Sequence, residues 1–173
     1  MLYKMENAKK LILRRQKDWG GESKVLVKRM KPPKQAGMIA TRTIKKGETI
    51  AYYPIVLIAD PGSKTKDPLR NYFIEVRYKG KQNKLVGKPD LAVVAKKPTR
   101  AIPYTGLWSN EPYPSQTPNA KMVGSDLKRK PAVGDKIKYS LKATKTIHKG
   151  EEVMWCYGTE FDRGSPPYKT GCP

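Results

Sequence analysis

The 173-residue sequence contains one short motif twice, and this repeat limits the folds that the chain can adopt. Residues 40–48 read ATRTIKKGE and residues 143–151 read ATKTIHKGE. In each copy one Ile stands between polar residues, and the Gly after Lys can adopt a positive φ and close a turn. We predict two β-turn-β units, one on each side of the fold, with Ile44 and Ile147 buried. A single repetition is too little for a solenoid.

The rest of the chain contains short β-rich segments separated by Gly and Pro. An amphipathic helix is predicted at 1–17, ending at Gly20-Gly21. Strands are predicted at 23–30, 37–40, 49–59, 72–78, 84–86, 137–141 and 152–157. Pro54 indicates an edge strand or a bulge. Because no strand alternates with a long helix, a doubly wound sheet is excluded, and the pattern favours a mostly-β fold with small helical inserts.

The segment 98–118 is rich in Pro, Gly and Asn and has neither a helical nor a strand period. A segment of this length without regular structure inside a compact domain is usually functional. We therefore expect part of the functional site to lie here.

The net charge is +21, and basic residues outnumber acidic ones at the N-terminus, in the middle and before the second repeat. Such an even basic surface favours a polyanionic partner, either nucleic acid or an acidic surface. The alternative is a solvated surface in a compartment rich in polyanions. Both interpretations stay open.

Metal and cysteine chemistry have little support in this sequence. The two cysteines, Cys156 and Cys172, and the single histidine, His148, cannot complete a zinc quartet. One disulfide is compatible with the sequence but not required, and we predict an intracellular protein with reduced thiols. No apolar run is long enough to span a bilayer, so no membrane partner is expected. There is no phosphate-binding loop and no H-E-x-x-H motif.

Three stretches together resemble one family. They read GMIATRTIKKGETIAYY, then GLWSNEPYPSQTPNA, then YSLKATKTIHKGEEVMWCYGTEF. This order is similar to the SET domain of protein lysine methyltransferases, over about residues 25–163. The resemblance implies a β-clip-like SET fold with several short curved sheets, few short helices and a pseudo-knotted C-terminal segment. It implies an N-terminal extension at 1–22, a SET-like domain at 23–163 and a tail at 164–173.

The resemblance also implies methyl transfer from S-adenosyl-L-methionine to a lysine of a protein substrate, histone being one candidate, without a metal. The implied catalytic residues are Tyr157, whose hydroxyl would orient the lysine amine, and Tyr52, which would wall the lysine channel. Tyr53, next to Tyr52, is the alternative at that place. The implied cofactor-binding residues are Gly37, Met38, Trp108, Asn110, Glu111 and Phe161.

The sequence departs from the family pattern at three places. Gln35 replaces the first glycine of a pair, Glu111 replaces a histidine, and Cys156 replaces the acid before the tyrosine. The family's zinc-binding cysteine tail is absent. The alternative function is therefore an inactive SET-like basic protein that binds nucleic acid or chromatin, and a nuclear location is favoured over a cytoplasmic one.

A second expectation concerns acidity near the motifs. Acidic residues cluster there, and we expect them to receive a basic peptide; they are Glu111, Glu151, Glu152, Glu160 and Asp162.

Overall fold

The computed structural model describes residues 2–19, 21–30, 36–62, 66–67, 69–79, 81–124, 127, 129–158, 161 and 169–172. For residues 2–5, 77 and 81–83 it describes the backbone only. The predictions for Gln35, Glu160 and Asp162 fall outside the described residues.

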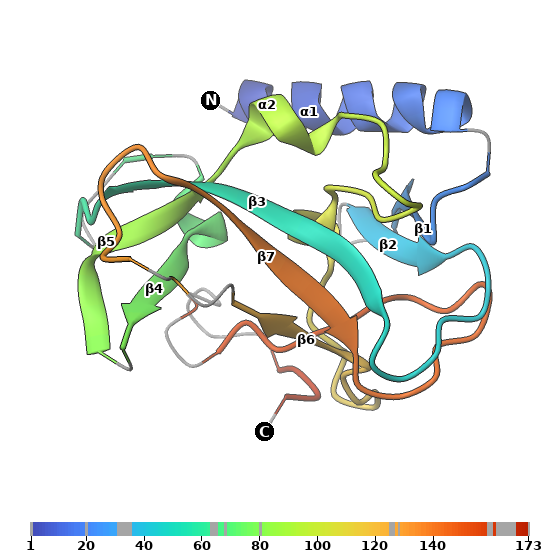
Figure 1. The fold of residues 1–173 in the computed structure, drawn as a ribbon. Helices are drawn as coiled ribbons and strands as arrows, with labels where there is room; N and C mark the ends of the chain where they lie inside the picture. The colour runs from blue at the N-terminus through green and yellow to red at the C-terminus, as the bar shows by residue number, and fades with distance from the viewer. Residues whose placement is uncertain are drawn as a thin grey trace.

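The described chain is built mostly from strands, which confirms the predicted mostly-β, SET-like fold class (Figure 1). The helical elements are α1 (Leu2–Arg15), η1 (Gln16–Trp19), η2 (Arg70–Tyr72), α2 (Leu91–Val94) and η3 (Gly106–Trp108). The strands are β1 (Val25–Arg29), β2 (Ala36–Ala40), β3 (Thr49–Ala59), β4 (Ile74–Tyr78), β5 (Lys81–Pro89), β6 (Ala120–Val123) and β7 (Lys136–Ala143). Strands β1 and β2 form a small antiparallel sheet, and the larger sheet has the order β4-β5-β3-β7-β6.

The larger sheet has one buried face and one exposed face. Ile55 of β3 lies opposite Ile137 of β7, and both are buried. Lys136 and Lys138 flank Ile137 and are exposed. This alternation follows from the strand period of two, and it places the core on the Ile55 face.

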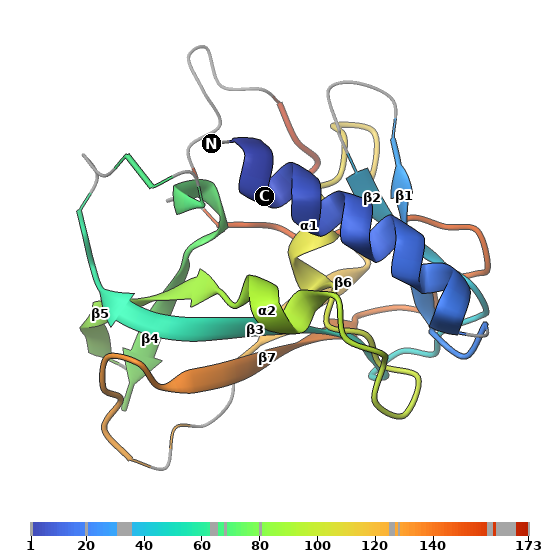
Figure 2. The ribbon, with the colours of Figure 1, turned by 90° about the horizontal axis from the view of Figure 1, so that it is seen from above.

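The N-terminal helix lies against the body of the protein. Figures 1 and 2 show α1 beside α2, on the side of β3 where β1 and β2 also lie. Ile12 of α1 and Trp19 of η1 are almost fully buried, so the predicted helix contributes to the core. None of the described helices is long and apolar enough to cross a membrane.

The two repeated turns pack against each other rather than on opposite sides of the fold, so that prediction is wrong. Ile44 N donates to Ile147 O at 2.8 Å, and Ile147 N donates to Ile44 O at 2.9 Å. Gly47 N donates to Ala143 O and Gly150 N donates to Ala40 O, both at 2.9 Å. Both isoleucines are fully buried, as predicted. The repeat therefore forms one paired structure, visible at the right of Figure 1.

Pro54 does not make β3 an edge strand, because β3 is the central strand of its sheet. The bulge of β3 lies between Thr49 and Ala51 instead. Pro54 is tolerated because pairing with β5 begins only at Ile55, and Pro54 O accepts from Asp90 N just beyond the end of β5. Pro54 therefore lacks an N–H at a position where no neighbouring strand would accept a hydrogen bond from it.

Two further differences concern the C-terminal half. Strand β6 was not predicted, and the predicted strand at 152–157 forms only isolated bridges, at Glu152 and Met154. The residues of 152–157 have strand-like composition, but their neighbours are mainly loops, so no continuous ladder forms.

Candidate active site

The segment after the second repeated turn runs between β2 and the long Pro-rich loop. On one side, Val153 N donates to Met38 O at 2.8 Å. On the other side, Met154 forms a parallel bridge with Asn110, and Trp155 N donates to Asn110 O at 3.0 Å. This path brings together the three stretches that resemble the SET domain.

Asn119 replaces the missing strand partner in this region. Its amide donates to Glu152 O at 2.8 Å, and its Oδ1 accepts from Met154 N at 2.8 Å. The side chain is almost fully buried. Asn119 was not predicted as a site residue, although it lies in the stretch GLWSNEPYPSQTPNA that resembles the family.

Asn110 and Gly37, both predicted as cofactor-binding residues, lie next to each other. Asn110 Nδ2 donates to Ala36 O at 2.8 Å and to Glu152 Oε1 at 2.9 Å. A Cβ on Gly37 would lie 2.9 Å from both Asn110 Nδ2 and Glu152 Oε1, which is too close. A side chain at position 37 would therefore displace the hydrogen-bonded ends of Asn110 and Glu152 at this junction between β2, the loop and the C-terminal segment.

Tyr157 is fixed at both its backbone and its hydroxyl. Its hydroxyl donates to Ser109 O at 2.8 Å, and its backbone N donates to Glu111 Oε1 at 2.9 Å. Glu111 is only 5% exposed, so this carboxylate is committed to the interior. Asn110 thus lies between two residues that hold Tyr157.

Aromatic rings surround Tyr157. The Phe161 ring lies 4.6 Å from the Tyr157 ring and the Trp155 ring lies 5.3 Å from it, both edge-to-face. Trp155 was not predicted as a site residue, although its place two residues before Tyr157 puts both rings on one side of an extended segment.

Two indole N–H groups near these residues lack acceptors. Among the described residues, Trp108 Nε1 and Trp155 Nε1 are buried without a hydrogen-bond partner. A buried donor without an acceptor is costly and usually has a ligand or water as its partner. Trp108 ends η3 two residues before Asn110, and Trp155 precedes Tyr157 by two. The site therefore has donors ready for an acceptor-bearing ligand such as a nucleoside or a carboxylate.

Two of the predicted residues lie apart from this cluster. The Met38 side chain is fully buried, with its sulfur 3.4 Å from Thr105 Oγ1, so only its backbone meets the C-terminal segment. The Tyr52 ring packs on Tyr104 at 5.8 Å, under Lys138. Among the described residues, no ring contact joins Tyr52 to Tyr157.

Tyr53, the alternative to Tyr52, is a core residue. Its hydroxyl donates to Tyr72 O at 2.6 Å, and burial raises its pKa well above the ordinary range of tyrosine. It therefore stays protonated and hydrogen-bonded in the interior.

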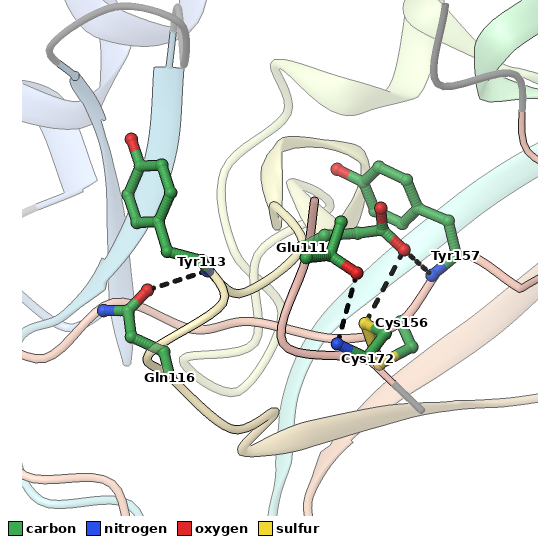
Figure 3. Close-up of a disulfide and its surroundings, with 7 residues drawn as sticks. Glu111, Tyr113, Gln116, Cys156, Tyr157 and Cys172 are labelled. Carbon is green, nitrogen blue, oxygen red and sulfur yellow. Dashed lines mark hydrogen bonds between the residues drawn. A yellow bond between two sulfur atoms is a disulfide. The ribbon is translucent and has the colours of Figure 1, made fainter. Parts of the chain in front are cut away.

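The prediction of reduced thiols is wrong for this structure, because Cys156 and Cys172 form a disulfide with their Cα atoms 5.7 Å apart (Figure 3). The sulfur of Cys172 lies 3.7 Å from Glu111 Oε1. The C-terminal segment therefore reaches the site. The described residues contain no group of three or more His, Cys, Asp or Glu that could hold a metal.

Comparisons with known proteins agree with this geometry. The family model of the SET domain matches residues 35–158, well over half of the chain. A search of curated proteins gives no match. Among solved structures, a Plasmodium falciparum protein described as a candidate histone methyltransferase has a similar fold, with a TM-score of 0.51 and 20% identity. The similarity covers 80% of this chain and 96% of the Plasmodium protein.

Proposed function

The chain belongs to the SET-domain family, and from this premise we propose that it is an S-adenosyl-L-methionine-dependent protein lysine N-methyltransferase. The observation that carries the proposal is the fixed Tyr157, held by Ser109 and Glu111, with the Trp155 ring 5.3 Å from its own ring. A residue fixed at two points is pre-organised to position a substrate atom.

S-adenosyl-L-methionine, when bound, supplies a methyl group on a cationic sulfonium. The residues suited to hold it are Gly37 with the Met38 backbone, Trp108, Asn110 and Phe161. The Trp108 indole can donate to an acceptor of the cofactor, and the Phe161 ring offers an apolar face.

Tyr157 acts on the lysine amine in this proposal. Its hydroxyl hydrogen is donated to Ser109 O, and its oxygen is the atom that we propose as the acceptor for the amine. The amine must be neutral to attack, although its ordinary pKa is about 10.4. The rings of Trp155 and Phe161 place apolar surface beside Tyr157, and apolar surroundings lower the pKa of a lysine.

The proposed substrate is a basic protein segment, with histone as the candidate class. Fewer acidic side chains are open to a substrate than the sequence predicted, because Glu111 is buried and Glu152 is bonded to Asn110. Glu151 is exposed, so of the acids that the structure describes here it is the one available to a substrate. We predict a lower substrate affinity for Glu151→Gln, with the affinity for the cofactor unchanged.

Calorimetric titration and a radiolabelled methyl assay test the proposal. We expect binding of S-adenosyl-L-methionine, transfer to histone proteins, and a loss of about 100-fold in kcat for Tyr157→Phe. Tyr78→Phe, on β4, is the matched control and should retain activity. Absence of cofactor binding at millimolar concentration, or equal rates for Tyr157→Phe and wild type, would reject it.

A second candidate function is nucleic-acid binding by the outer face of the larger sheet. Lys136, Lys138 and Lys142 share one face of β7, and Lys121 of β6 lies directly opposite Lys142. Like charges opposite each other destabilise a sheet, and phosphate groups would relieve this repulsion. In the described part of the chain, no ion pair involves Lys121, Lys138 or Lys142.

Aromatic rings accompany these lysines. Lys138 Nζ lies 4.1 Å above the Tyr52 ring and 6.0 Å from the centre of the Tyr104 ring. Cationic side chains beside aromatic rings are typical of surfaces that track a nucleic-acid backbone and stack on bases. Such a surface would also favour a nuclear location and a substrate presented on DNA.

Fluorescence anisotropy with a labelled oligonucleotide at several salt concentrations tests this second function. Changing Lys121, Lys138 and Lys142 to Gln should weaken binding and reduce the slope of log K against log salt by about 2–3. The control changes Lys17, Lys79 and Lys97, which are exposed elsewhere. A flat salt response, or equal effects of the two triple variants, would exclude this surface.

A further inference from the structure

The disulfide joins the candidate active site to the C-terminal segment 169–172, a connection that the proposed methyl transfer does not use. Cys156 immediately precedes Tyr157, and Cys172 is 16 residues away in sequence. The disulfide therefore links the residue before Tyr157 covalently to the C-terminal segment 169–172. Whatever holds Cys172 in place also constrains Tyr157.

The C-terminal segment sits on the loop that continues from Asn110 and Glu111. Gly171 N donates to Pro112 O at 3.0 Å. A Cβ on Gly171 would lie 1.8 Å from Gln116 O and 2.5 Å from Tyr113 O, so the backbones are in direct contact. Only glycine fits at this contact.

Glu111 lies at the centre of the arrangement. The same oxygen, Oε1, accepts from Tyr157 N at 2.9 Å and lies 3.7 Å from the Cys172 sulfur. Figure 3 shows Glu111 between Tyr157 and the disulfide. A sulfur in a disulfide carries no proton, so in this state Tyr157 does not compete with Cys172 for that oxygen.

The segment has few other attachments among the described residues. One backbone hydrogen bond joins it to the loop, and the bond from Cys172 N to Thr170 Oγ1 is internal. A single hydrogen bond contributes less than the conformational entropy lost on ordering several residues. The disulfide is therefore the main attachment of this segment to the site.

We propose that Cys156–Cys172 is a redox clamp of the active site. In the oxidised protein the disulfide keeps 169–172 on the loop and Tyr157 bound to Glu111, and reduction releases the segment and slows methyl transfer. This inference rests on the proposed function, since it concerns the regulation of the same site.

The chemical step is a thiol–disulfide exchange with a dithiol. The dithiol gives two electrons and two protons, the S–S bond breaks, Cys156 and Cys172 become thiols, and the dithiol becomes a disulfide. Once the S–S bond is broken, Cys172 is free to leave Glu111 together with its segment, and the backbone before Tyr157 loses the covalent constraint.

Hydrogen exchange of the Tyr157 amide tests the clamp without requiring activity. The full chain is compared before and after treatment with dithiothreitol, and thiol alkylation confirms the redox state. We expect at least tenfold faster exchange of the Tyr157 amide after reduction, with the Ile44 and Ile147 amides unchanged. Equal Tyr157 exchange in both states would overturn the clamp.

Methyl-transfer assays then separate the clamp from the proposed function. We expect reduction to lower kcat about tenfold, reoxidation to restore it, and the Cys156→Ser, Cys172→Ser double variant to keep the reduced rate with or without dithiothreitol. Equal rates in both redox states would reject the clamp and leave the methyltransferase proposal standing. No transfer in either state would reject the methyltransferase proposal, while hydrogen exchange still decides on the clamp.

Three single variants keep both cysteines and test two things: the contact of Gly171 with the loop, and Glu111 as a positioning residue. Gly171→Ala should displace the segment and lower kcat in the oxidised protein, with no recovery on further oxidation. Glu111→Ala should lower kcat more than it changes KM for the peptide. Glu111→Gln, which keeps an acceptor for Tyr157 N, should recover most of the rate. Wild-type kcat in both Gly171→Ala and Glu111→Ala would contradict the clamp.

Discussion

The two copies of the repeated motif form nearly the same local structure. Gly47 and Gly150 both have a positive φ, at 86° and 90°. Glu48 Oε2 accepts from Lys45 N at 2.7 Å, and Glu151 Oε2 accepts from His148 N at 2.8 Å. Each copy therefore builds the same turn, and each uses the other as its packing partner.

The copies differ in the segments that they lead into. After Glu48 the chain enters β3, which has strand neighbours on both sides. After Glu151 the chain reaches a region where the side chain of Asn119 bonds the backbone in place of a strand. The same turn thus leads once into scaffold and once into the candidate site. The difference shows that the neighbours, rather than the turn, decide where function arises.

The largest expected effect concerns the isoleucines at the contact between the copies. Ile44→Ala and Ile147→Ala each remove a fully buried side chain, and each should lower the free energy of unfolding by about 2–5 kcal/mol. Urea denaturation measures this. If the copies are equivalent, the two losses should agree within about 1 kcal/mol. The free energy of unfolding lost in the double variant should differ from the sum of the two single losses, because the residues are in contact.

Asn119→Ala should disturb only the segment that follows the second copy of the repeat. It leaves Glu152 O and Met154 N without the partners that the amide supplies, and the expected cost is about 2–3 kcal/mol. Denaturation and methyl transfer should both be affected. Asn71→Ala, at an exposed residue, is the control with an expected change below about 0.5 kcal/mol. A neutral Asn119→Ala would show that the backbone alone holds this segment.

The sequence was informative where structure is local. The β-branched and aromatic run at 49–59 ends where β3 ends, and Gly47 has the positive φ that its place in the turn required. The motifs that carry Asn110, Glu111 and Tyr157 are far apart in the sequence but lie together in the structure, while the roles that the resemblance implies for these residues stay predictions.

Contacts between distant segments could not be read from the sequence. Which of Tyr52 and Tyr53 faces the core depends on the register of β3 against β7, which a local pattern does not specify. The disulfide depends on where residues 169–172 dock, and a pair of cysteines does not reveal this. Asn119 is a site residue because it substitutes for a strand, a role that no local period indicates.

The glycines provide a smaller, symmetrical test. Gly47→Ala and Gly150→Ala place a side chain at positive φ, where the cost is about 1–2 kcal/mol. A Cβ at either position meets no atom within 4 Å, so the cost is conformational alone and should be equal. Thermal denaturation of both variants measures it. Unequal losses would show that the turns differ in strain despite their shared hydrogen bonds.

The smallest expected effect separates the two glutamates by charge. Hydrogen bonds from Lys45 N and then Arg42 lower the pKa of Glu48 from 4.5 to about 2, and Lys24 also contacts it at 3.5 Å. Glu151 is exposed, and the described ion pairs do not include it. Gln retains an acceptor, so Glu48→Gln and Glu151→Gln isolate the charge.

Because the pKa of Glu48 is lower in the folded state, its charge stabilises the protein above about pH 4.5, and this contribution disappears as the pH falls toward 2. Glu48→Gln should therefore cost about 0.5–1 kcal/mol at pH 7 and progressively less between pH 4.5 and 2. Glu151→Gln should cost less at pH 7, about 0.3 kcal/mol or below. Urea denaturation across this pH range measures both. A pH-independent loss in Glu48→Gln would mean that its shape, rather than its charge, matters, and the two turns would then be equivalent in their electrostatics as well.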